Sequence, residues 1–156
     1  MNLPTLLAKH LREVYFGGNW TWVNFKEQSA DITWQQATQK IHSFNTIAAL
    51  VFHMNYYVAA AIRVLQGQPL DASDKFSFNH PPIASDADWQ SLLDASFQDA
   101  ETLASLLEQL PEEKLWDTFV DEKYGNYYRT IQGTIEHTHY HLGQITLIKK
   151  LLDRPL

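Results

Sequence analysis

Cysteine is absent from the sequence, which excludes a disulfide framework, a thiolate nucleophile and a thiolate metal site. Any metal ion must therefore be bound by histidine, carboxylate or carbonyl groups. Positive charge is also scarce, since 12 Lys and Arg stand against 18 Asp and Glu and leave a formal net charge of -6. Such a surface repels a phosphate backbone, so nucleic acid is not an expected partner.

Other patterns are missing as well. We find no uninterrupted apolar run long enough to span a bilayer and no cleavable leader pattern at the N-terminus, so we expect a cytoplasmic protein without a membrane partner. The chain has no Gly-x-Ser-x-Gly sequence, which argues against a serine hydrolase of that type. It also has no glycine-rich loop that could cradle a phosphate.

Apolar and aromatic residues, in contrast, are plentiful. Hydrophobic residues make up 45% of the 156 residues and include five Trp, seven Tyr and eight Phe. Two separate cores would each be small and marginal in a chain of this length. We therefore expect residues 1–156 to form a single domain with one core.

Four long segments repeat their apolar residues at helical spacing and predict an all-α protein. These segments run from about residue 4 to 16, 43 to 66, 85 to 110 and 124 to 152. Gly17, Gly67 and Pro111 follow the first three and suit helix ends. No segment has the pattern of a strand, and four long helices around one core indicate a helical bundle.

Aromatic residues mark the segments between the predicted helices. In residues 19–40 we expect a packed loop with a short helix from about 33 to 40, and with Trp20, Trp22 and Trp34 as core anchors. Residues 67–84 contain too many helix breakers for regular structure, but Phe76 and Phe78 suggest that this loop packs down. Long loops in compact domains are often functional.

The most informative stretch places three histidines at alternate positions of the last predicted helix. At about 100° per residue, His137 and His141 share a face, whereas His139 points to nearly the opposite side. Two imidazoles four residues apart can bind one metal ion. A pair alone is a weak signal, since one interior and one surface histidine would give the same spacing.

His53 strengthens the metal interpretation because it lies within the apolar stripe of the second long helix. A buried histidine bonded to a carbonyl is the plain alternative. If the second and last helices are neighbours, His53 completes a three-nitrogen site with open positions for water or substrate. Tyr57 and Gln144, each one turn from a histidine of this set, could orient ligands or contact substrate, although core packing is the commoner role.

Two further features bear on the last helix. Glu136 and His139 have the Glu-x-x-His spacing of di-iron proteins, but a second such motif is missing and residues 43–66 contain no acidic residue. A di-iron site is therefore not expected. Gly143 lies inside the helix, where glycine is unfavourable, and suggests that another helix approaches closely there. No carboxylate is placed as a general base, so the sequence identifies no catalytic residue.

With these residues the chain resembles the DinB-like superfamily, which includes the YfiT-type proteins. The resemblance is carried by His53 in Leu-Val-Phe-His-Met-Asn-Tyr-Tyr and by His137-Thr-His-Tyr-His141-Leu-Gly-Gln-Ile. It implies a four-helix bundle with a long crossover connection and frequent homodimers. It also implies one divalent ion, zinc, nickel or iron, bound by His53, His137 and His141. His139 departs from the usual pattern of the family, but it points away from the pair.

The resemblance implies no single reaction, because relatives include thiol-dependent S-transferases, a mycothiol-dependent isomerase and metal-dependent hydrolases. We expect a metal-dependent enzyme of the S-transferase or hydrolase type that acts on a small-molecule substrate. A low-molecular-weight thiol is a candidate second substrate. The alternative is a non-catalytic bundle that is stabilised by a metal or binds a small ligand.

Overall fold

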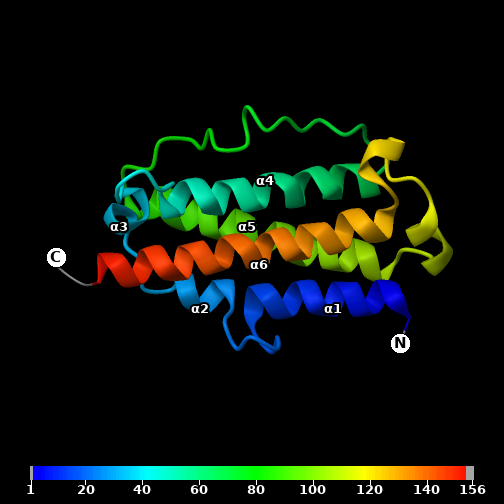
Figure 1. The fold of residues 1–156 in the computed structure, drawn as a ribbon, viewed down its shortest axis with the longest axis horizontal. Helices are drawn as coiled ribbons and strands as arrows, with labels where there is room; N and C mark the ends of the chain where they lie inside the picture. Colours follow the sequence, from blue (N-terminus) through cyan, green and yellow to red (C-terminus); the bar gives the residue numbers. More distant parts are fainter. Residues whose placement is uncertain (1, 154–156) are drawn as a thin grey trace.

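In the computed structural model, which describes residues 2–153, four long helices pack into a bundle (Figure 1). They are α1 (Leu3–Phe16), α4 (Ile47–Leu65), α5 (Asp86–Glu108) and α6 (Tyr127–Leu152). The short helices α2 (Phe25–Ser29) and α3 (Trp34–Thr38) and the 3-10 turns η1 (Glu112–Trp116) and η2 (Glu122–Tyr124) connect them. Residues 2–153 contain no strand beyond one isolated bridge, so the all-α prediction is confirmed.

The order of the helices in space is not a simple up-and-down arrangement. Helix α1 packs against α5 and α6, and α4 packs against the same two helices. Figure 1 shows α4 and α5 running in the same direction, joined by residues 66–85, which return along the length of α4. We call residues 66–85 the crossover segment. It is the long crossover connection that the family resemblance implied.

Side-chain caps set the starts of the long helices. Each begins after a residue whose side-chain oxygen accepts a hydrogen bond from a backbone N–H three positions further on, namely Asn2, Thr46, Ser85 and Asn126. Helices α4 and α6 therefore begin a few residues later than the apolar periodicity predicted. The residues just before these caps form turns instead.

Most of the buried hydrophobic residues of α1, α4, α5 and α6 belong to one cluster. Helix α4 is the most apolar element and is long and apolar enough, by length and composition alone, to cross a membrane. The stretch is interrupted by His53, Asn55 and Arg63, so it is not the uninterrupted apolar run whose absence was expected. About two thirds of the stretch, 67%, is buried inside the structure, as in the core helix of a bundle.

The structure corrects the prediction for residues 19–40. Helix α2 was not expected, and Trp20 and Trp22 are 93% and 87% exposed rather than core anchors. Only Trp34 is partly buried against the core. The loop is closed instead by the buried Asn19, whose amide donates to the carbonyls of Glu13 and Val23 at 2.8 Å each.

The prediction for Gly143 was also wrong within the described chain. This residue is exposed, and a Cβ atom added there would meet nothing within 4 Å. The glycine therefore does not mark a close helix approach between the elements of residues 2–153.

Candidate metal centre

The structure brings His53, His137 and His141 together in the groove between α4 and α6. The Nε2 atom of His137 lies 3.0 Å from the Nε2 atoms of both His53 and His141. His53 and His141 are each only 7% exposed. Each of the three histidines offers one ligand nitrogen, and these three atoms all lie within 4.8 Å of one another.

The outer nitrogens of two of these rings have partners that determine the tautomer. Ser77 Oγ donates to the carbonyl of Asp74 and lies 3.0 Å from Nδ1 of His53, so this nitrogen carries the proton and donates to Ser77. Nδ1 of His141 lies 2.7 Å from Oε1 of Gln144, an oxygen that only accepts. Both rings therefore direct an unprotonated Nε2 towards the centre.

Electrostatics favours neutral imidazoles at this position. Burial, together with the neighbouring His141 and His53, lowers the pKa of His137 to about 4. Burial also lowers the pKa of His53 and of His141. Neutral imidazole is the form that binds metal ions, so the site is in its ligand state at neutral pH.

The donor set fits a divalent ion. Lone pairs of neutral nitrogens repel one another at 3.0 Å unless a cation or a proton lies between them. Two nitrogens that each lie about 2.0–2.1 Å from one ion are separated by roughly 2.9–3.4 Å at ordinary coordination angles. Three imidazoles are also the protein ligands of a well-known class of catalytic zinc site with an open position.

The crossover segment forms one wall of this site. Ser77 is fully buried, and the ring of Phe78 stacks on His53 with centroids 3.8 Å apart and planes 8° from parallel. The sequence suggested that Phe78 would pack down, but it did not indicate its partner. The roles of Ser77 and Asp74 were missed, because a single serine in a proline-rich loop has no spacing that distinguishes it.

Tyr57 and Gln144 occupy the positions expected of them beside the histidines. The edge of Tyr57 packs against His53 and His137, at centroid distances of 5.1 and 5.2 Å. Its hydroxyl donates to the Asp74 carboxylate, and burial and this carboxylate raise the pKa of Tyr57 to about 12. Tyr57 is thus protonated at neutral pH and lines the site. Gln144 instead orients the ring of His141 through its hydrogen bond.

His139 lies outside the cluster, as its helical phase predicted. Its ring packs against His10 of α1, with centroids 5.8 Å apart. Glu136 is exposed and accepts a hydrogen bond from Gln132, so it supplies no carboxylate to the histidines. Within residues 2–153 the cluster therefore has nitrogen ligands alone, which further disfavours a di-iron centre.

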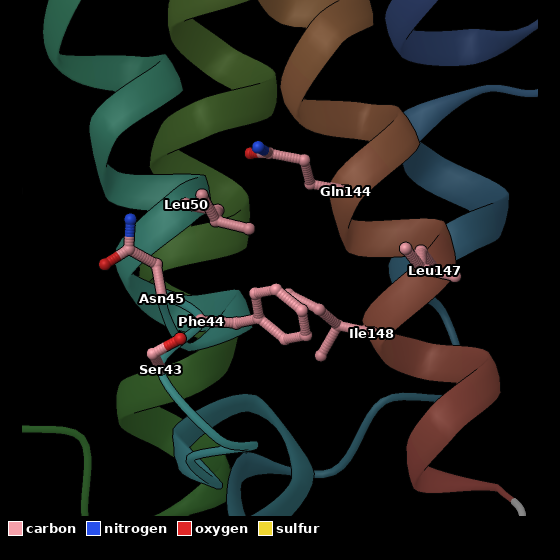
Figure 2. Close-up of a pocket in the computed structure, with 7 residues that line it drawn as sticks. All are labelled: Ser43, Phe44, Asn45, Leu50, Gln144, Leu147 and Ile148. Carbon is pink, nitrogen blue, oxygen red and sulfur yellow. The ribbon is translucent and has the colours of Figure 1, made fainter.

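Two cavities adjoin the three histidines along the groove between α4 and α6. One, of about 310 Å³, is drawn in Figure 2 and is lined by Ser43, Phe44, Asn45, Leu50, Gln144, Leu147 and Ile148. The other, of about 320 Å³, is lined by Tyr57, Ala60, Ala61, Leu70, Ala72, Asp74, Phe119, Tyr124, Thr130 and Thr134. Leu50 and Tyr57 lie one turn to either side of His53, so the histidines lie between the two cavities.

Comparison with known proteins places the chain in one family. The family model described as the DinB superfamily matches residues 19–145, a range that contains all three histidines. No curated protein and no solved structure matches the chain.

Proposed function

Because the chain belongs to the DinB superfamily, we propose that it is a metal-dependent enzyme whose ion is held by Nε2 of His53, His137 and His141. The observation that carries the proposal is the hydrogen bonding of the outer ring nitrogens. Ser77 and Gln144 take up the outer N–H groups of two rings, which leaves their inner nitrogens free to bind a cation.

A divalent ion on three neutral imidazoles keeps its full charge and, when bound, lowers the pKa of a water or thiol so that a nucleophile exists near neutral pH. The chain's own residues prepare the site for this chemistry. Phe78 and Tyr57 pack against His53, and Ser77 and Gln144 orient the rings of His53 and His141. The reaction class is attack on a small molecule by water or by a separate thiol, as in a hydrolase or S-transferase, since the chain has no cysteine.

The main alternative is a bundle in which the metal ion only stabilises the fold. A closed structural site uses four protein ligands, whereas this cluster offers three. The two cavities that flank the histidines also offer space for a small molecule close to the proposed ion. Both observations favour catalysis over a purely structural ion.

Metal content tests the site itself. Protein purified without added metal should hold about one divalent ion per chain, and His53→Ala and His141→Ala should each lose it. His139→Ala is the matched control, because His139 belongs to the same sequence motif but packs on His10, and it should keep the ion. Full occupancy in both of the first two variants would overturn the proposal.

Activity measurements distinguish an enzyme from a bundle in which the metal ion is only structural. Ester and amide hydrolysis and transfer to small thiols should be assayed with and without a chelator. Activity that chelation abolishes and that the original metal restores supports the proposal. If chelation lowers only the melting temperature and no reaction is found, the structural role is the better description.

A further inference from the structure

We propose that the cavity in Figure 2 binds an uncharged ligand with a hydrogen-bond acceptor next to an apolar group, such as the amide or ester of a short acyl chain. This inference rests on the proposed function, since it names the class of substrate that reaches the histidines. It follows from the position, the donor groups and the charge of the cavity.

The cavity adjoins the histidines through two of its lining residues. Leu50 precedes His53 by one turn on α4, and Gln144 follows His141 by one turn on α6. Gln144 also bonds directly to the ring of His141. A ligand in this cavity therefore lies beside the site of the proposed ion.

Gln144 determines which polar group the ligand must present. Its Oε1 atom already accepts from Nδ1 of His141, whereas its amide nitrogen can only donate to further partners. Figure 2 shows this side chain extending from α6 across the cavity towards α4. A ligand that meets it must offer an acceptor such as a carbonyl oxygen.

The rest of the lining is apolar or neutral. Phe44, Leu50, Leu147 and Ile148 supply hydrocarbon, and Ser43 and Asn45 supply uncharged polar groups. None of the lining residues is Lys, Arg, Asp or Glu, so in the metal-free chain a carboxylate placed here would lose water without gaining a counter-charge. The net charge of -6 adds to this preference against anions.

The second cavity does not change this preference. Its lining contains no Lys or Arg, and its one charged residue is Asp74, the partner of Tyr57. In the metal-free chain, the lining of neither cavity can thus pair with an anionic group. The volume of about 310 Å³ lies at the small end of ligand sites, which span about 300–1,000 Å³, and suits a short acyl compound.

Hexanamide and hexanoate test the preference, because they share a hydrocarbon chain and differ in charge. Both should be titrated into the metal-free full chain and followed by NMR at the side chains of Leu50, Gln144 and Ile148. Omitting the metal prevents the carboxylate from binding an ion directly. Hexanamide should shift these signals and bind at least tenfold more tightly than hexanoate. Equal binding of the two, or no binding of hexanamide, would overturn the inference.

Variants on the exposed side of α6 locate the binding. Leu147→Trp should fill the cavity and abolish the shifts, whereas Leu151→Trp, one turn further on and outside the lining, should leave them unchanged. Both leucines are exposed, so neither change disturbs the core. Gln144→Leu should weaken hexanamide binding about five- to tenfold through loss of the donor. Unchanged binding in Leu147→Trp would contradict the proposed location.

The two proposals fail separately. Failure of hexanamide to bind, with one ion still held by the histidines, rejects the ligand class and leaves the metal site standing. Loss of the metal site, with selective hexanamide binding retained, rejects the proposed enzyme and leaves a neutral-ligand cavity.

Discussion

Two segments of the molecule place aromatic residues among polar ones outside the four long helices, and they differ in what those residues contact. In the loop of residues 17–24 between α1 and α2, Trp20 and Trp22 lie almost fully in solvent. In the crossover segment, Phe78 stacks on His53, although 37% of it is still exposed. These loop aromatics thus differ because the fold places a ring beneath Phe78 but leaves Trp20 and Trp22 in solvent.

The two segments also differ in what their buried polar residue holds. Asn19 bonds to the backbone carbonyls of Glu13 and Val23, six and four residues away, and closes its own loop. Ser77 instead bonds to a histidine 24 residues away and links the crossover segment to α4. Asn19 thus stabilises a turn, whereas Ser77 connects a loop to a histidine of the candidate metal centre.

Among the changes in these two segments, loss of the Ser77 hydroxyl should have the largest effect, which is on metal affinity. Ser77→Ala leaves Nδ1 of His53 without its acceptor, so metal affinity should fall about 10- to 100-fold, the usual range for such a partner of a ligand. Competition with a coloured chelator measures the affinity. Ser73→Ala, an exposed serine of the same segment, should bind metal as the native chain does. Native affinity in Ser77→Ala would show that His53 is oriented by other contacts.

Removal of the ring that covers His53 should come next. Phe78→Ala should lower the free energy of unfolding by about 1–2 kcal/mol, less than for a fully buried ring because part of Phe78 is exposed. Urea denaturation of the metal-free protein measures this. Phe76→Ala, which truncates a ring that is 53% exposed, should cost about 0.5 kcal/mol or less. Equal losses in the two variants would contradict the special role of the stack.

The covered histidines should make the metal-free fold sensitive to acid. Folded His137 is protonated only near pH 4, whereas the unfolded chain takes up that proton near pH 6.5. The unfolded state therefore binds more protons between these values, and stability should fall as the pH drops from about 6.5 to 4. Urea melts across this range should give a shallower dependence for His137→Gln. Identical pH profiles would mean that burial does not disfavour the charged ring.

The smallest effect is expected at the exposed tryptophans. Trp20→Ser and Trp22→Ser should each change the free energy of unfolding by no more than about 0.5 kcal/mol, because neither ring is buried in the described chain. Metal affinity should also stay unchanged. A loss comparable with that of Phe78→Ala would show that the two segments are alike after all.

The sequence predicted the parts of the molecule that depend on local periodicity. Helical phase selected His137 and His141 and set His139 aside, and the apolar surroundings of His53 marked it as unusual. What could not be predicted depends on contacts between distant segments. Ser77 becomes important only because the crossover segment passes over α4, and nothing in its own neighbourhood signals this.

The tryptophans also show that burial in a loop cannot be predicted from hydrophobicity alone. Hydrophobicity indicated that Trp20 and Trp22 would be anchors, but the short connection between α1 and α2 turns them outwards while Asn19 fills the buried position. The cavities also escaped prediction, since they depend on how side chains from α4, α6 and the loops fit together.

The crossover segment forms a wall of the site without being part of the helical framework. Most of its side chains are exposed, and the residues from 66 to 85 form neither a helix nor a strand. Surface connections of this kind tolerate substitution and changes of length far better than packed helices do. Substitutions and changes of length can therefore accumulate in the crossover segment while α1, α4, α5 and α6 keep their packing. One scaffold can in this way come to serve several reactions, with loop variation rather than core variation as the source of diversity.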